Sequence, residues 1–394
     1  MSAHETVIIP KKELPANIVR LGWALTLIGL ALVTVSYLTD AQRAGFNNII
    51  GFTFLASIAV GAVFFIALEY IAGAVWTTPF RRVLEFLGML LIPVALLAIP
   101  LFLNLHDLYH WTHADVVAND KVLLSKSPYL NEQFFTIRFG IYLLIWGAFY
   151  FIFRRNSMKQ DLNSDQKFTK KNIALAAAFI PLLAISISLF SIDWLMSLEP
   201  HWFSTMFGVY YFTGTILTAL AVTTYFVVVL SEKGFFFKGI NENHYYSFGA
   251  LMFGLLSFWA YIAFSQFMLI WYANLPEENF WFISRWQNGW EYVSIAIVLL
   301  HFWIPYFMLV SRPSKMKPTV LKNSALLLIF SHFLDLYWLV MPTYSDTPVF
   351  SYYELAFPIL TVGLIIVLFA IQAKKYNMVP VGDPKLQRGI DFHL

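Results

Sequence analysis

Long runs of apolar residues, separated by short polar segments, are the dominant pattern of this chain. A helix needs about 20 predominantly apolar residues to cross the hydrocarbon core of a bilayer. The runs that reach this length are residues 19–38, 48–75, 83–105, 134–154, 172–197, 204–230, 245–273, 289–310, 321–341 and 350–373. The pattern therefore predicts an all-α integral membrane protein, with ten transmembrane helices in a domain of residues 19–373 between two tails, 1–18 and 374–394.

The composition agrees with this class and excludes several others. Of the 394 residues, 59% are hydrophobic and 12% are charged, which is far from the composition of a soluble domain. The first apolar run is too long for the core of a signal peptide, so we expect it to remain as a helix. The absence of cysteine excludes disulfides, thiolate-held iron–sulfur clusters and covalently attached c-type haem in this chain. No basic stripe typical of a nucleic-acid-binding fold is present, so nucleic acid is not an expected partner.

Lysine and arginine are concentrated on one side of the predicted topology. All but five of the 26 residues of these types fall in the two tails, in the loops on the same side as the tails, or beside those loops. The five exceptions are Arg43, Lys121, Lys126, Arg138 and Arg285. Because basic residues collect in cytoplasmic loops, we expect both termini in the cytoplasm. The opposite, outer side carries two long loops, 106–133 and 274–288, which we expect to bind a protein partner.

Two of the predicted helices end in a similar way. Asp193 stands seven residues before Pro200, and Asp335 stands seven residues before Pro342. The two helices lie four helices apart and run in the same direction. This spacing predicts two four-helix bundles, at about 48–197 and about 204–341, related by a parallel repeat. Helices 19–38 and 350–373 would flank them.

Ionisable side chains inside a bilayer are costly and usually functional. The candidates for a proton relay are Asp193, Asp335, His332, His301, Glu69, Arg138 and Glu291. We expect a path from Asp335 through His332 and His301, with Glu69 nearer the cytoplasm, and a pairing of Asp193 with Arg138 near the outer mouth. Two alternatives stay open: His301 and His332 are hydrogen-bonded packing residues, or Asp193 lies shallow and in contact with water.

The same residues raise the question of a cofactor. His301 and His332, predicted at similar depth on neighbouring helices, could ligate one b-type haem, although no second pair is evident. Quinol is another candidate ligand, because it needs an apolar slot with one or two proton-accepting groups. The candidates near a quinone are His106, Asp107, Glu199 and His201, beside Asp193. Gln266 fits an interhelical hydrogen bond better, and we predict no other metal site and no catalytic residue.

Two segments of the chain resemble a known family. Residues 191–211 read S-I-D-W-L-M-S-L-E-P-H-W-F-S-T-M-F-G-V-Y-Y, and residues 105–113 read L-H-D-L-Y-H-W-T-H. They look like the F subunit of bacterial alternative complex III, a quinol:electron-acceptor oxidoreductase, and the resemblance extends over essentially the whole chain. It implies an NrfD-like (polysulfide-reductase membrane-subunit-like) fold of two four-helix bundles plus two helices, in the bacterial inner membrane.

The resemblance also implies partners. These are a homologous membrane subunit, an outer-side iron–sulfur subunit and c-type haem subunits, with a terminal oxidase as a further candidate. The partners would hold the metal cofactors, and quinol oxidation would take place in the homologous subunit, which leaves a quinone site in this chain open. A proton-conducting role is implied for Asp193 by its match to the motif and for Asp335 by inference.

Two other functions remain as alternatives. A stand-alone secondary transporter would have paired breaks in its helices, for which Pro93, Pro181 and Pro305 are weak signals. A purely structural membrane subunit would use its buried charges for packing alone.

Overall fold

The computed structural model describes residues 13–237 and 239–394. In this part of the chain the regular elements are all helical, and ten segments are long and apolar enough to cross a membrane. Their bounds are α1 (Ala16–Thr39), α2 (Ala41–Ala72), Thr78–Leu103, α8 (Glu132–Asn163), Gln166–Leu198, α10 (Phe207–Glu232), α11 (Glu242–Ala273), Trp290–Leu309, Pro318–Thr343 and α17 (Tyr352–Lys375). The ten predicted membrane helices are therefore confirmed.

Four of these segments are composite. The segment Thr78–Leu103 consists of η1 (Thr78–Phe80), α3 (Arg81–Leu87), η2 (Gly88–Leu90) and α4 (Leu91–Leu103), and Gln166–Leu198 contains α9 (Gln166–Trp194) and η4 (Met196–Leu198). The segment Trp290–Leu309 consists of α13 (Trp290–Ile297), η5 (Val298–Trp303) and α14 (Ile304–Leu309). The segment Pro318–Thr343 consists of α16 (Pro318–Val340) and η6 (Met341–Thr343). Pro181, by contrast, lies inside the continuous helix α9.

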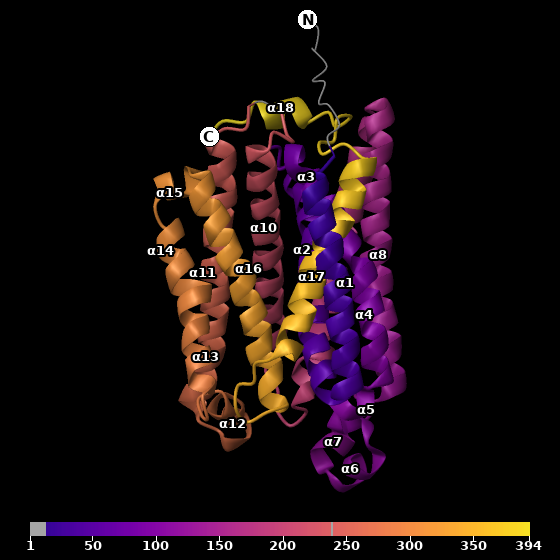
Figure 1. The fold of residues 1–394 in the computed structure, drawn as a ribbon, viewed down its shortest axis with the longest axis vertical. Coiled ribbons are helices and arrows are strands. Elements are labelled where there is room, and N and C mark those ends of the chain that lie inside the picture. Colours follow the sequence, from indigo (N-terminus) through magenta and orange to yellow (C-terminus); the bar gives the residue numbers. More distant parts are fainter. Residues whose placement is uncertain (1–12, 238) are drawn as a thin grey trace, which may run out of the picture.

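The connections carry short helices. They are α5 (Leu105–Leu108), η3 (His110–Thr112), α6 (Ala114–Asn119), α7 (Lys121–Lys126), α12 (Pro276–Ser284), α15 (Arg312–Met316) and α18 (Leu386–Ile390). The first four form a lobe that projects beyond the ends of the long helices (Figure 1). At the opposite end, α18 lies over the helix bundle. We use "α18 end" and "α12 end" for the two ends of the molecule.

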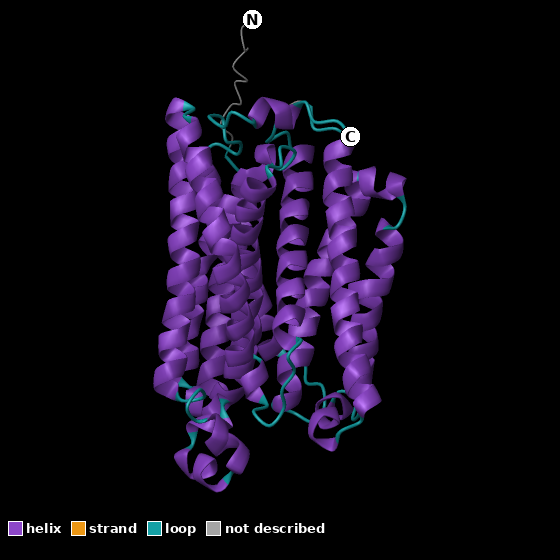
Figure 2. Cartoon of the chain, turned by 180° about the vertical axis from the view of Figure 1, so that it is seen from behind, coloured by secondary structure: helices purple, strands orange, loops and turns teal. Residues whose placement is uncertain are grey.

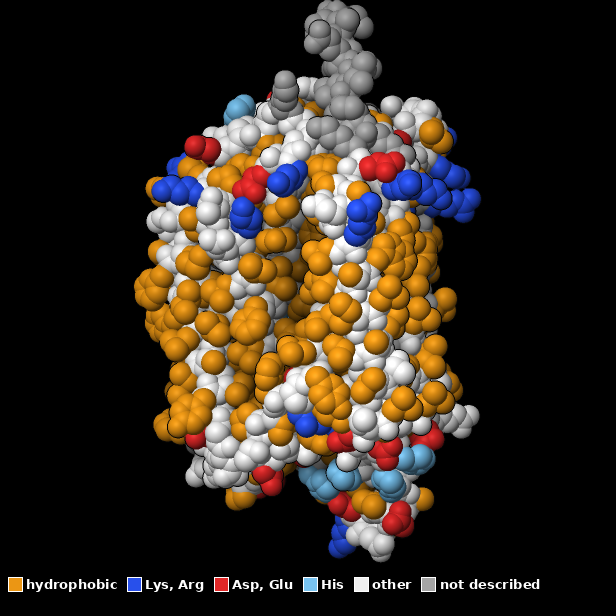
Figure 3. Space-filling view, viewed as in Figure 1, with side chains coloured by type: hydrophobic (Ala, Val, Ile, Leu, Met, Phe, Trp, Pro, Cys, Tyr) orange, Lys and Arg blue, Asp and Glu red, His pale blue; other side chains and the backbone are white. Residues whose placement is uncertain are grey.

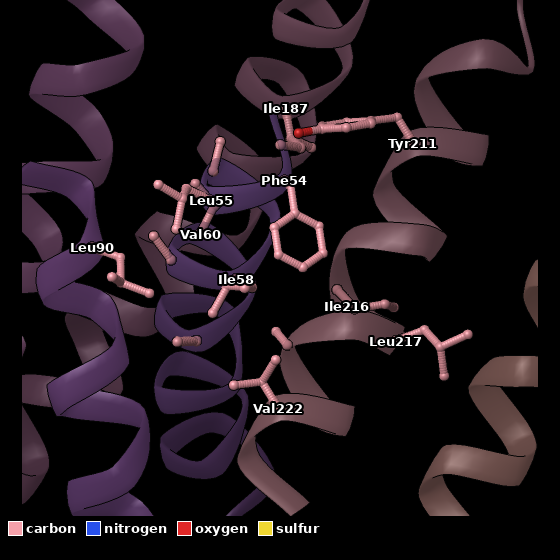
Figure 4. Packing of buried hydrophobic residues seen from close by; sticks show 14 of the residues in the cluster. Phe54, Leu55, Ile58, Val60, Leu90, Ile187, Tyr211, Ile216, Leu217 and Val222 are labelled. Carbon is pink, nitrogen blue, oxygen red and sulfur yellow. The ribbon is translucent and has the colours of Figure 1, made fainter. Parts of the chain in front are cut away.

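Helices α2 and α10 form the centre of the molecule and pack directly against each other. Both are buried along most of their length, and their apolar side chains interdigitate (Figure 4). At Gly61 a Cβ atom would lie 2.4 Å from Cβ of Ala219 and 2.9 Å from the carbonyl oxygen of Thr215. Small residues allow helix backbones to approach this closely in membranes, where dispersion contacts replace the hydrophobic effect.

The remaining helices contact this central pair in two groups. The first helix set consists of α2, α4, α8 and α9, with α2 against α4 and α9, and α8 against α9. The second helix set consists of α10, α11, α16 and the segment 290–309, with α10 against α11 and α16. Helices α1 and α17 pack against each other and both contact α2. The grouping agrees with the helices assigned to the two predicted bundles, while the repeat that would relate them stays a prediction.

The surface is divided into bands. On the face shown in Figure 3 an apolar belt surrounds the middle, most of the lysine and arginine lies near the α18 end beside a few acidic residues, and acidic residues with histidine predominate near the other end. The loops gather at the two ends, outside this belt (Figure 2). Such a belt is the surface expected of a multi-pass membrane protein. Of the basic residues used to predict orientation, Lys11, Lys12 and Lys238 lie outside the described residues, as do residues 1–12 of the N-terminal tail.

Candidate functional site

Asp193 and Arg138 form a closed ion pair inside the first helix set. Nε and Nη2 of Arg138 donate to the two carboxylate oxygens of Asp193 at 2.9 and 2.8 Å, and the Tyr142 hydroxyl donates to Oδ2 at 2.7 Å. The guanidinium also donates to the carbonyl oxygen of Tyr129 and lies over the Tyr129 ring, 3.8 Å from its centroid. Asp193 is 1% exposed, so it is buried rather than in contact with water. The topology had led us to expect this pair.

Asp335, the corresponding aspartate of the second helix set, has different partners. It is 2% exposed, and the hydroxyl of Tyr210 on α10 donates a hydrogen bond to its Oδ1. Among the described residues, Asp335 has no ion pair. The buried carboxylate therefore depends on one neutral donor. A buried carboxyl without a cation partner can take up and release a proton without breaking an ion pair.

His332 lies one helical turn before Asp335 on α16. Its Nε2 is 3.1 Å from Oγ of Ser57 on α2, and its Nδ1 is buried without a hydrogen-bond partner in the described part of the chain. The ring fits closely against Gly214 of α10, where a Cβ atom would lie 2.8 Å from Cε1 of His332. A larger residue at 214 would displace the imidazole, so the close approach depends on the glycine.

His301 lies beside His332 at a similar depth. The centroids of the two rings are 6.2 Å apart, and His301 stacks on the indole of Trp259 at 3.9 Å. Both ring nitrogens of His301 are buried, and neither has a partner among the described residues. Buried polar atoms are usually hydrogen-bonded. The packing alternative, in which both histidines make interhelical hydrogen bonds, therefore fits His332, which contacts Ser57 of α2, and does not fit His301.

His301 belongs to a widened helical turn. Residues Val298–Trp303 form a π-helix between α13 and α14. Pro305 has no N–H group, so it cannot donate to the carbonyl of His301 as an ordinary helical residue would. The missing i to i−4 bond favours the wider turn, and single π turns occur often at functional sites.

A polar seam continues from His332 between α2 and α10. The Ser57 hydroxyl lies 3.2 Å from the Tyr211 hydroxyl and 3.3 Å from Oγ1 of Thr215, and Tyr211 donates to the carbonyl oxygen of Thr53 at 2.9 Å. Hydroxyl groups both donate and accept hydrogen bonds. The seam therefore offers a row of exchangeable protons next to the histidine.

Glu69 lies away from the histidines, at the α18 end. Its Oε1 accepts hydrogen bonds from Arg81 at 2.8 Å and from Thr78 at 3.0 Å. Arg81 also binds Asp383 of the C-terminal tail at 2.6 Å. Burial is the largest single influence and raises the pKa of Asp383, but the charge and hydrogen bond of Arg81, together with the backbone N–H and charge of Lys385, outweigh it, so the pKa falls below its ordinary value. The structure thus places Glu69 in an ion network that holds the C-terminal tail, instead of bringing it to His301 and His332.

The other predicted site residues are dispersed at the α12 end. Glu291 accepts the backbone N–H of Gly289, and His106 is exposed, 3.3 Å from Glu132. Asp107 is exposed, Glu199 is half-buried, and His201 lies 2.6 Å from Asp120. The hydrogen bond from His201 lowers the pKa of the half-buried Asp120 carboxyl. The structure does not bring these residues together with the histidine pair.

A pocket of about 820 Å³ opens in the second helix set. Its wall includes Tyr210, Trp259, Gln266, Trp281 and Trp338. His106, Asp107, Glu199 and His201, the candidates for a quinone, are not among its lining residues. A smaller pocket of about 380 Å³ lies beside Lys126, Pro200 and Trp202.

Sequence reasoning missed Tyr210, Ser57 and Trp259. Tyr210 stands in the segment 191–211 that carries the family resemblance, which is the one signal that could have identified it. Gln266, which we expected to bond between helices, has a buried Oε1 without a partner among the described residues.

The arrangement is suited to proton exchange. Tyr210 donates to Asp335, and His332 lies within hydrogen-bond distance of Ser57; one helical turn of α16, from His332 to Asp335, joins these two pairs. All four side chains are buried, and each carries an exchangeable proton. In the described residues, no group of three or more His, Asp or Glu side chains is arranged to hold a metal ion. No protein-family model matches the sequence, and no curated protein matches it.

Proposed function

We propose that this chain is an integral membrane subunit of a bacterial respiratory quinol:electron-acceptor oxidoreductase of the alternative complex III type, and that it carries protons along Asp335, Tyr210, His332 and Ser57. The observation that carries the proton path is the buried Asp335 carboxylate, which has a tyrosine donor and, in the part of the chain that the structure describes, no cation partner. Chains of acidic residues and histidines are the usual proton relays of membrane proteins.

The place of the chain in a respiratory complex is supported by residues 191–211 and 105–113, which resemble the family. In that complex this chain would contribute no metal cofactor. A homologous membrane subunit, an iron–sulfur subunit and c-type haem subunits would hold the redox groups. The lobe at the α12 end would face these outer subunits. A terminal oxidase is a further partner in this proposal.

The orientation follows from the basic residues near the α18 end. We place this end in the cytoplasm and the α12 end on the outer side of the bacterial inner membrane. Asp335, Tyr210 and the Asp193–Arg138 pair then lie toward the outer side, and the path continues inward through His332.

The first experiment tests the assembly. An affinity-tagged chain extracted in mild detergent should purify with iron–sulfur and c-type haem proteins, and its reduced-minus-oxidised spectrum should show their c-type bands. A colourless chain that purifies alone would contradict the complex and favour a transporter. A b-type band from the isolated chain would assign His301 and His332 to a haem instead.

The second experiment tests the proton path. The intact complex is reconstituted in liposomes, and the protons moved per electron are measured during quinol oxidation. Asp335→Asn should lower this ratio while electron transfer continues. The matched control is the double variant Arg138→Gln with Asp193→Asn, which removes an aspartate without leaving a buried charge and should keep the ratio. An unchanged ratio in Asp335→Asn would refute the path.

A further inference from the structure

The pocket in the second helix set is accessible from the bilayer. Helix α11 and the segment 290–309 form its two sides, and α10 and α16 contribute Tyr210, Trp338 and Leu339. Residues at its rim are exposed: Tyr261 is 64% exposed, Phe264 62% and Trp303 44%. These residues lie in membrane-spanning helices, so an occupant would enter from the lipid. A volume of about 820 Å³ is within the range of small-molecule sites.

Very few polar atoms face this space. Oε1 of Gln266 is buried and has no hydrogen-bond partner in the described residues. The side chain of Tyr210 lines the pocket, and its hydroxyl donates to Asp335. Ser294 is already bonded, because it accepts from Trp338 and donates to the carbonyl oxygen of Arg285. Trp259 also lines the pocket, and its indole Nε1–H is buried without a partner among the described residues. One unpaired acceptor and one unpaired donor therefore suit a ligand that carries a hydrogen-bond donor and an acceptor on an otherwise apolar molecule.

The walls favour a flat ring. Trp281 stacks on Trp202 with a centroid distance of 4.4 Å and an interplanar angle of 12°. Its ring also lies 3.6 Å from the guanidinium carbon of Arg285. These two contacts cover both faces of the indole and hold it in place, so Trp281 presents a rigid aromatic edge to the pocket. The face of a flat ligand ring packs well against such an edge in a T-shaped contact.

The composition of the lining argues against a phospholipid head group. Neither lysine nor arginine lines the pocket. Arg285 lies behind Trp281 and donates to the carbonyl oxygens of Trp281, Trp338 and Leu339. An acyl chain alone would leave Gln266 unsatisfied. A ring that carries a hydroxyl group, attached to an apolar tail, satisfies each of these features.

We infer that this pocket binds the head group of an isoprenoid quinone or quinol, and that Tyr210 transmits its occupancy to the Asp335 carboxylate. This inference deepens the respiratory role proposed above and rests on it for the identity of the ligand. A quinol hydroxyl donates to Oε1 of Gln266, and the tail leaves between α11 and the π turn at Val298–Trp303. Tyr210 touches both the pocket and Asp335, so a ligand that contacts its ring or hydroxyl changes the hydrogen bond to the carboxylate.

Photolabelling tests the binding. A short-tailed azido-quinone is crosslinked to the purified, lipid-reconstituted protein, and the labelled peptides are identified. Label is expected in residues 257–267 or 294–306 and should be displaced by unlabelled quinone. Gln266→Leu, which keeps the side-chain size, should weaken binding about five- to tenfold, and Ala263→Trp should abolish it by filling the pocket.

Gln42→Leu is the matched control, because it makes the same chemical change at an exposed glutamine that bonds to the backbone of Asp107. It should leave labelling unchanged. Label that lands only in the first helix set would overturn the inference. So would labelling that both pocket variants leave intact, or label displaced by phosphatidylglycerol and not by quinone.

Infrared difference spectroscopy tests the coupling. Addition of quinone should perturb a carboxyl band that disappears in Asp335→Asn and shifts in Tyr210→Phe. Label in the pocket without such a band would overturn the transmission through Tyr210. The two proposals can fail separately. If the probe labels this pocket and the Asp335→Asn variant keeps the wild-type ratio of protons to electrons, the binding site is supported and the proton path is refuted.

Discussion

The two aspartates near the α12 end occupy corresponding places in the sequence and have opposite surroundings. Asp193 has three donors, of which two come from the guanidinium of Arg138. Among the described residues Asp335 has one donor, Tyr210, although an arginine contacts the end of the same helix, α16. That arginine, Arg285, donates to backbone carbonyls at the end of α16, and burial lowers its pKa.

The difference separates two uses of a buried charge. A carboxylate paired with arginine is held in one charge state and one geometry, and such a pair is expensive to break. A carboxyl bonded to a tyrosine can gain a proton without leaving a cation unpaired. We therefore expect Asp193 to hold helices α8 and α9 together and Asp335 to exchange protons. The stability lost when a buried charge is substituted should then depend on whether that charge is paired, and not on how deeply it is buried.

The largest loss of stability is expected on substitution of Arg138. Arg138→Gln leaves Asp193 buried with only the Tyr142 hydroxyl, and removal of one partner from a buried pair costs about 3–5 kcal/mol. Thermal unfolding of the purified protein in detergent measures the loss. The double variant with Asp193→Asn should recover most of it. A double variant no more stable than Arg138→Gln would show that pairing is not the reason.

The second-largest loss of stability is expected on substitution of Asp383, a paired buried charge at the opposite end of the molecule. Asp383→Asn removes one partner of Arg81, which keeps Glu69 and Glu85, so the loss should be smaller, about 1–3 kcal/mol.

The pH dependence of this effect has a definite sign. The folded pKa of Asp383 is lowered, so its contribution is fully present above the ordinary aspartate pKa of about 4 and is lost as the pH falls through the folded value. Unfolding temperatures of the wild type and Asp383→Asn should therefore differ at neutral pH and converge below about pH 4. A constant difference at all pH values would contradict this.

A small effect on stability is expected at Asp335 itself. Asp335→Asn breaks no ion pair, and the amide oxygen can still accept from Tyr210, so the change should be about 1 kcal/mol or less. The same unfolding assay measures it. A loss as large as that of Arg138→Gln would make Asp335 a structural residue and remove the distinction between the two aspartates.

The smallest effect is expected at His201, whose pair with Asp120 is exposed to solvent. Exposed ion pairs contribute little to stability, since water and salt screen them. His201→Gln should leave the unfolding temperature unchanged within error. A clear decrease would show that the lobe at the α12 end is held by its charges and not by its apolar contacts.

The ten spans could be predicted because bilayer thickness imposes a length on apolar runs. The nearness of Arg138 to Asp193, and of His301 to His332, could also be inferred, since charges confined to ten helices have few places to lie. In both cases it was enough to know that the two residues lie at a similar depth in the membrane on neighbouring helices.

The partners of Asp335 could not be predicted in this way. Tyr210 is 125 positions distant in sequence, and nothing in the pattern of α10 shows which of its neighbouring tyrosines, Tyr210 or Tyr211, faces α16. The rotation of each helix about its axis decides this, and rotation depends on packing. The tail presents the same problem, because Asp383 looks like a residue of a polar terminus until the fold places it against Arg81.

The π turn at Val298–Trp303 bears on how this helix could change during evolution. An α-helix advances about 100° per residue, so the insertion of one residue would rotate every later side chain to a new face. A widened turn absorbs the extra residue locally. The gain or loss of a single codon in this turn would therefore leave the packing contacts of α13 and α14 unchanged. His301, which lies within the turn, would instead be rotated away from His332.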